Sequence, residues 1–122
     1  MVAAMTITTS PSTRMFVTRS PGVELCLLRN HPDRGLTFLI RMAQGARSER
    51  HGHPGGEETY VLSGRVRIEQ RIAADQRPLP AVSLAAGDHL FAEPGEIHEG
   101  VAEEATEFLV FAPGGIARGT AG

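Results

Sequence analysis

Two histidines one residue apart, His51 and His53, are the side chains of this sequence best suited to hold a metal ion. In an extended segment, residues i and i+2 point to the same side, so both imidazoles can reach one ion at about 2.0–2.1 Å. Residues 54–56, Pro-Gly-Gly, allow a sharp turn that brings the carboxylate of Glu57 back toward the same point. The spacing alone also fits two solvated histidines on a surface loop, so the neighbouring residues must decide.

Residues 45–64 carry a wider pattern around these histidines. They resemble the first motif of the cupin superfamily, Gly-x5-His-x-His-x3-4-Glu-x6-Gly. All five fixed positions match, at Gly45, His51, His53, Glu57 and Gly64. A match at every fixed position favours ligation over a solvated loop.

A second resemblance lies in residues 87–98. The second cupin motif, Gly-x5-Pro-x-Gly-x2-His, is matched at Gly87, Gly95 and His98. Glu93 stands at the motif's proline position, and Pro94 follows one residue later. This departure concerns the shape of the loop, because the position is not a metal ligand in the motif.

The resemblance to cupins implies a fold and a ligand set. The family's fold is a double-stranded β-helix, a jelly-roll-like barrel, with a metal inside its mouth. The ligands carried over residue by residue are His51, His53, Glu57 and His98, which suit one divalent transition metal: Fe, Mn, Ni, Cu or Zn. The resemblance covers residues 15–113, which predicts a cupin domain there, an N-terminal tail or edge strand in 1–14, and a C-terminal tail in 114–122.

Glu57 and Glu58 are adjacent, and only one of them is expected to bind the metal. Counting back from Gly64 in the motif selects Glu57. Side chains alternate along a strand, so Glu58 should share the opposite, outer face with Tyr60 and Leu62. Outward apolar side chains need cover, which predicts a homodimer.

The pattern along the rest of the chain has period two and no long helical stretch. Polar and β-branched residues alternate strictly in residues 65–69, as in a strand with one buried face. Turn residues separate nine such short runs, which predicts an all-β sandwich or barrel. The predicted strands are residues 14–19, 23–29, 36–43, 57–62, 65–72, 82–84, 89–92, 97–101 and 106–112.

Length and composition limit the partners. A chain of 122 residues fits one domain, and its net charge of −2 provides no excess positive field for nucleic acid. No segment approaches the roughly 20 apolar residues of a membrane span. Cys26 is the only cysteine, so no intrachain disulfide can form and a reducing cytoplasm is expected.

The remaining histidines and acidic residues have ordinary interpretations. His31 lies in a turn and is expected to face solvent, and His89 begins a strand where a structural hydrogen bond is expected. The neighbourhood of the second motif is acidic, which predicts a solvated rim. The rim residues are Glu93, Glu96, Glu99, Glu103, Glu104 and Glu107.

The site indicates metal chemistry without specifying a substrate. Our first hypothesis is an enzyme acting on a small oxygen-bearing organic molecule at the metal, by a dioxygenase-like route. Residues 51–58 are also similar to the cupin domains of bacterial zinc-dependent regulators, so the alternative is a metal-dependent sensing or binding module without catalysis. A third hypothesis is a non-redox isomerase or lyase.

Overall fold

Strands are the only regular elements in residues 6–118, the part of the chain that the computed structural model describes. The predicted all-β fold is therefore confirmed. No helix in this part is long and apolar enough to cross a membrane. The strands are β1 (Val17–Ser20), β2 (Val23–Asn30), β3 (Leu36–Met42), β4 (His51–Gly52), β5 (Glu57–Ser63), β6 (Arg65–Ile72), β7 (Pro78–Leu79), β8 (Val82–Ala85), β9 (His89–Ala92), β10 (Ile97–Ala102), β11 (Thr106–Ala112) and β12 (Ala117–Arg118).

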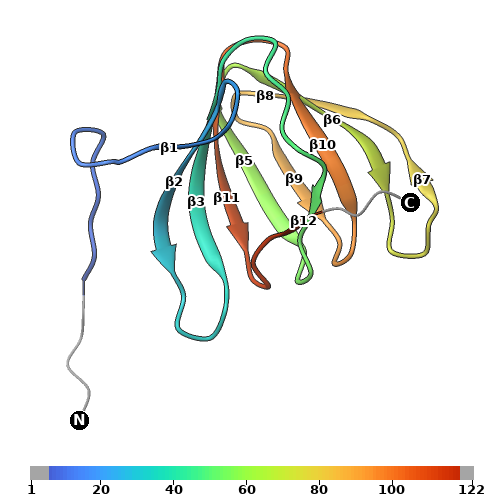
Figure 1. Ribbon diagram of the computed structural model, residues 1–122, viewed down its shortest axis with the longest axis horizontal. Helices are drawn as coiled ribbons and strands as arrows, with labels where there is room; N and C mark the ends of the chain where they lie inside the picture. The colour runs from blue at the N-terminus through green and yellow to red at the C-terminus, as the bar shows by residue number, and fades with distance from the viewer. Residues whose placement is uncertain (1–5, 119–122) are drawn as a thin grey trace.

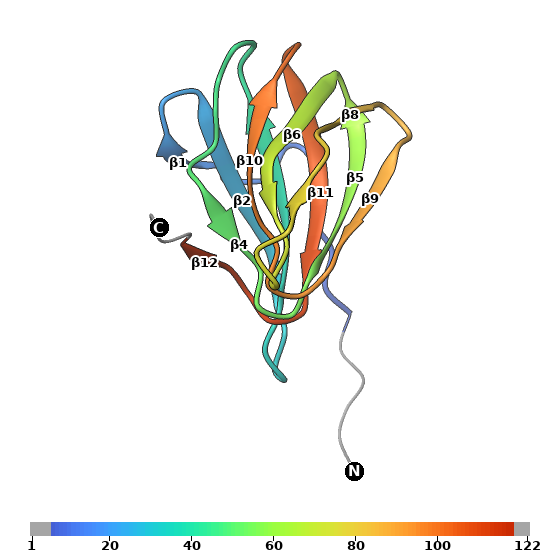
Figure 2. The same ribbon diagram turned by 90° about the vertical axis from the view of Figure 1, so that its right-hand side faces the viewer.

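These strands form two antiparallel sheets (Figures 1 and 2). The first sheet has the order β1-β2-β3-β11-β5-β9. The second has the order β12-β4-β10-β6-β7, and β8 also pairs with β6. Strands distant in sequence become neighbours, because β11 lies between β3 and β5. The chain thus passes back and forth between the sheets, as in a jelly roll.

Alternation of side chains builds the core between the sheets. In β5, Thr59 and Val61 are buried whereas Tyr60 and Leu62 are about half exposed. The same alternation is present in residues 65–68 of β6 and throughout β11. The core cluster consists of Val23, Phe38, Met42, Val61, Val66, Ile68, Leu84, Ala102, Phe108, Val110 and Ala112.

The predicted strands are present, and β6, β9 and β11 have the predicted bounds. Two differences are informative. The first strand begins at Val17 rather than at residue 14, because a turn closed by hydrogen bonds to the Ser10 carbonyl precedes it. The strands β4, β7 and β12 were not predicted, because pairs of residues are too short to show a periodicity.

The outer face of the first sheet carries an apolar patch, formed by Tyr60, Leu62, Phe91 and Phe111, with exposed fractions between 36% and 56%. Phe91 and Phe111 flank Glu58 in register, one on each neighbouring strand. The expected outward direction of Tyr60 and Leu62 is therefore confirmed. The homodimer inferred from it stays a prediction.

We predict that the apolar patch is the interface of a homodimer. A two-fold axis would bring the same patch of each copy together, and Leu62→Glu would add an unpaired charge to it. Light scattering at micromolar concentration should show a dimer for the wild type and a monomer for Leu62→Glu. Val17→Glu, at an exposed apolar position on β1, is the matched control and should remain dimeric. The reverse pattern would place the interface elsewhere.

Two motif glycines should differ in their importance for stability. Gly64 and Gly87 both have positive φ, +78° and +91°. A Cβ on Gly64 would collide with the Ala105 carbonyl oxygen, whereas a Cβ on Gly87 would have no atom within 4 Å. Gly87→Ala should therefore cost only the left-handed backbone penalty of about 1 kcal/mol, and Gly64→Ala about 3 kcal/mol or more because the backbone must also shift. Urea unfolding of both variants measures the difference; equal losses would contradict it.

Candidate metal site

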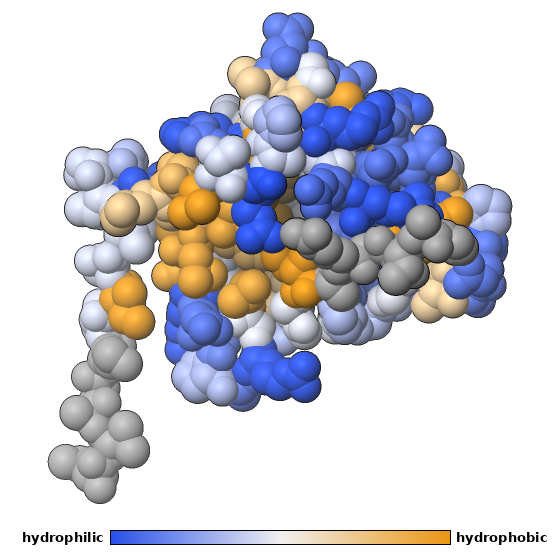
Figure 3. Space-filling view, viewed as in Figure 1, coloured by the Kyte–Doolittle hydropathy of each residue, from blue (hydrophilic) through white to orange (hydrophobic). Residues whose placement is uncertain are grey.

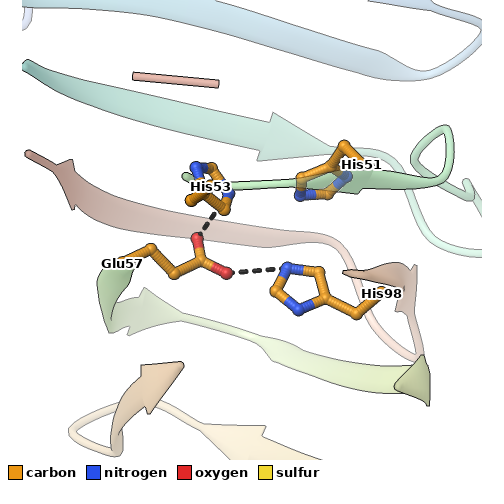
Figure 4. A group of neighbouring side chains, drawn as sticks. All are labelled: His51, His53, Glu57 and His98. Atoms are coloured by element: carbon orange, nitrogen blue, oxygen red, sulfur yellow. Dashed lines mark ion pairs between the residues drawn. The ribbon is translucent and has the colours of Figure 1, made fainter. Parts of the chain in front are cut away.

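Three histidines and one glutamate meet at one end of the space between the sheets (Figure 4). His51 begins β4, and His53 follows directly after that strand. His98 lies on β10 directly opposite His51, because the two strands pair antiparallel in this register. Glu57 begins β5 of the other sheet, after the turn at residues 54–56. Both sheets therefore contribute to the group.

The four side chains converge closely enough to share one ion. One donor atom from each residue lies within 4.8 Å of the donor atoms of the others. The carboxylate of Glu57 lies between two imidazoles, with Oε2 at 2.9 Å from Nε2 of His53 and Oε1 at 2.7 Å from Nε2 of His98 (Figure 4). His53, Glu57 and His98 are buried. The structure thus brings together the whole predicted ligand set.

Hydrogen bonds on the outer side of each ring fix the tautomer. Nδ1 of His51 lies 2.7 Å from the carbonyl oxygen of Glu49, and Nδ1 of His53 lies 3.2 Å from that of Gly115. Nδ1 of His98 lies 2.8 Å from Oε2 of Glu96. Carbonyl and carboxylate oxygens only accept, so every Nδ1 donates. In neutral rings the three Nε2 lone pairs are then left for the interior of the site.

This arrangement fits a divalent transition metal. Three lone pairs and a carboxylate face one another with no donor among them, and such a concentration of buried acceptors requires a cation or protons. Nε2 of His53 is buried and has no hydrogen-bond partner among the described residues, although a Glu57 oxygen is 2.9 Å away. Three nitrogens and one oxygen are a donor set suited to such metals.

The local electrostatics indicate which of the four side chains carries a proton when no metal is bound. Burial, together with the nearby His98, lowers the pKa of His51 to about 4, so this ring is neutral at pH 7. Burial opposes the charged form of Glu57, but the imidazoles of His53 and His98 outweigh it and hold the pKa of this carboxyl well below its usual range. Burial is likewise outweighed at His98, where Glu57 and Glu96 raise the pKa to about 9. A bound metal would replace that proton.

A cavity of about 260 Å³ lies beside the four residues. It reaches the surface at the exposed side chains of Arg19 and Glu49. Its walls are mainly apolar, with Leu25, Phe38, Ile40, Ile68, Phe108 and Ile116 among the lining residues. Figure 3 shows apolar surface gathered over β2 and β3 beside a hollow. The candidate metal site therefore opens into a pocket large enough for a small molecule.

Residues 113–116 close one side of the site. The Gly115 carbonyl accepts the hydrogen bond from His53, and Ile116 lines the cavity. Gly55 and Gly114 pack so closely that a Cβ on either would collide with the backbone of the other. The described part of the predicted C-terminal tail thus contributes to the site. Residues 119–122 lie outside the described residues, as do residues 1–5 of the N-terminal tail.

The structure separates the two adjacent glutamates as predicted. Glu57 is buried and points into the site, whereas Glu58 is exposed and pairs with His89 at 3.0 Å. His89 therefore makes the structural contact expected of it. His31 is only partly exposed, because its ring donates to or accepts from the Thr37 hydroxyl at 2.8 Å and lies against Phe111.

One interpretation of the acidic residues was wrong. Glu96 does not belong to a solvated rim: it is 4% exposed, bonds to His98, and accepts two hydrogen bonds of 3.0 Å from Arg71. The sequence feature that could have identified Glu96 is its spacing of two residues from His98, which is also the spacing between His51 and His53. The burial depends on Arg71, which is 25 residues away in sequence.

The all-β fold and the group of three histidines and a glutamate define the chain as a cupin. A family model described as the ChrR cupin-like domain matches residues 4–117, and the chain belongs to this family. No protein of curated function matches the sequence.

Solved structures with the same fold are distant in sequence. KdgF from Halomonas sp. is 20% identical with a TM-score of 0.68, over 85% of this chain and 92% of that one. An RmlC-like cupin from Shewanella frigidimarina is 20% identical with a TM-score of 0.68, over 86% and 88%. Oxalate decarboxylase from Bacillus subtilis is 21% identical with a TM-score of 0.77, over 97% of this chain but only 33% of that one. These similarities establish the fold alone.

We predict that Glu57→Gln weakens metal binding by at least about tenfold, the lower end of losses at metal-site partners. The variant keeps the size of the side chain but removes the negative charge that lies between His53 and His98. Calorimetric titration with the native metal measures the affinity. Glu58→Gln removes the same charge one residue away on the outer face and should bind like the wild type. Retained affinity in Glu57→Gln with loss in Glu58→Gln would overturn the assignment.

Proposed function

We propose that this cupin binds one divalent transition metal through His51, His53, Glu57 and His98, and that the metal binds a small oxygen-bearing organic molecule in the adjoining cavity. The observation that carries the proposal is the common orientation of the rings. Each Nδ1 is held by an acceptor, so each Nε2 is directed at the Glu57 carboxylate or the space beside it. Such an arrangement prepares a site for a cation.

The ligand number leaves room for chemistry. A six-coordinate ion held by four residues keeps two positions for water or a bidentate ligand, whereas a closed tetrahedral site keeps none. The metal would act as a Lewis acid and a template for the molecule bound to it. The first reaction class that we propose is oxidative cleavage by a dioxygenase-like route.

The cavity supports a ligand with an oxygen-bearing end and an apolar body. Its apolar walls suit a hydrocarbon portion. With a metal bound, the charged lining residues in the described part of the chain are Arg19, Arg50, Glu49 and Glu57, whose charges balance. A bound divalent ion would therefore leave the cavity net positive, which favours anionic or strongly polarised oxygen groups.

A metal-dependent binding or sensing module is the second candidate, and the scarcity of acid–base groups favours it. Among the described residues, and apart from the four proposed ligands, Glu49 is the only lining residue with a carboxyl or imidazole, and it is exposed. Proton transfer of the kind used by isomerases and lyases normally needs a positioned acid or base. The lining therefore supports metal-centred oxidation or simple binding more than the isomerase or lyase hypothesis.

Metal content and oxygen uptake should distinguish the two candidates. Protein purified without added metal or an affinity tag is analysed for its elements. Fe(II)-loaded protein is then tested for oxygen uptake with a panel of β-diketones, thiols and catechols. We expect bound iron and uptake with at least one substrate class, because the proposed site would hold an organic ligand in the cavity beside the ion.

Glu57→Gln should abolish the uptake, whereas Glu58→Gln should retain it, which separates site-bound iron from iron free in solution. Tightly held stoichiometric zinc, with no uptake on any panel member, would reject the oxygenase and support the binding module. Failure to bind any of Fe, Mn, Ni, Cu or Zn would reject both candidates.

A further inference from the structure

Glu96 is a buried carboxylate that the proposed ligand set does not include. Its side chain lies on the outer side of the His98 ring, opposite Glu57, so that the ring lies between two carboxylates. Oε2 accepts from Nδ1 of His98 at 2.8 Å and from Nε of Arg71 at 3.0 Å, and Oε1 accepts from Nη2 of Arg71 at 3.0 Å. All of its contacts come from donors, so Glu96 acts as an ionised acceptor.

Arg71 holds this carboxylate from the neighbouring strand. It lies near the end of β6, and its guanidinium binds Glu96 in a bidentate manner while Nη1 donates to the Pro80 carbonyl at 2.8 Å. The side chains of Arg71 and Glu96 are only 11% and 4% exposed. This bidentate contact with the rigid guanidinium fixes the position of the Glu96 carboxylate and keeps it ionised.

The three imidazoles are therefore not equivalent. His51 and His53 donate to neutral backbone carbonyls, whereas His98 donates to a charged carboxylate. Hydrogen bonds with an ionised partner are roughly twice as strong as neutral ones, and a carboxylate on one ring nitrogen makes the other nitrogen a better donor to a metal. A salt bridge that only joined β6 to the loop before β10 would have no need to contact His98.

We propose that Glu96, held by Arg71, is a positioning residue that makes His98 the strongest of the three imidazole ligands. The proposal rests on the proposed metal binding and ranks the three imidazole ligands by the strength with which they bind the metal. Glu96 does not touch the metal or the ligand. It fixes the plane and tautomer of the His98 ring and increases the electron density at Nε2.

The test compares Glu96→Gln with Glu93→Gln. Both remove one negative charge from the same loop, but Glu93 is exposed and makes no side-chain hydrogen bond or ion pair among the described residues. Metal affinity is measured by competition with a chelator. Glu96→Gln should bind metal about tenfold more weakly, and Glu93→Gln should match the wild type.

A second readout reports directly on the hydrogen bond. In the zinc-loaded protein, the Nδ1 proton of His98 should resonate furthest downfield of the three ligand imidazoles in a ¹H–¹⁵N spectrum, because its acceptor is charged. Glu96→Gln should shift that proton upfield and leave those of His51 and His53 in place. A purely structural salt bridge would change the melting temperature without moving either the affinity or this signal.

Glu96→Gln leaves Arg71 without its partner, which can impair folding. The double variant Glu96→Gln/Arg71→Gln removes both buried charges, and it should show the same loss of affinity and the same upfield shift. Wild-type affinity and an unmoved His98 signal in either folded variant would overturn the proposal while metal binding itself stands. A wild type that binds no metal would instead overturn the proposed function.

Discussion

The organisation of this protein depends on a group of hydrogen-bond acceptors that the two sheets hold close together. Three imidazole nitrogens and a carboxylate face one another, and three of these four side chains are buried. In a low dielectric such a group is unfavourable unless a positive charge compensates it. In the metal-free protein a proton on His98 supplies that charge, beside the strongly acidic Glu57. The fold therefore creates a site that attracts cations at His51, His53, Glu57 and His98.

The two sheets hold this group in place against its own repulsion. His51 and His98 are fixed side by side by the ladder of the second sheet, while Glu57 is fixed by β5 of the first. The ligand-bearing ends cannot separate without opening the core between the sheets, which contains Val61 and Val66 at zero exposure. The stability of the core thus maintains the geometry of the site.

Sequence reasoning succeeded where the structural cause was local. Alternation in β5 separates Glu57 from Glu58 because a strand places neighbours on opposite faces, and the same rule identifies the first half of β6. It failed at Glu96, whose burial depends on Arg71 from a different strand. It also gave no indication of the contact between His53 and Gly115, which are 62 residues apart. Tertiary pairing of this kind leaves no periodic signal.

The packing of Gly114 and Gly115 against residues 53–55 bears on the order in which the chain can assemble. His51, His53 and Glu57 lie within seven residues of one another, so these three can approach early and at small entropic cost. His98 requires the closure of a loop of more than forty residues, and Gly115 requires a still longer one. During synthesis the ring of His53 acquires its acceptor only after Gly115 has been made. A nascent chain can therefore offer an ion two or three loosely held donors, and the oriented set of four forms only when β10 has joined its sheet and Gly115 has reached His53.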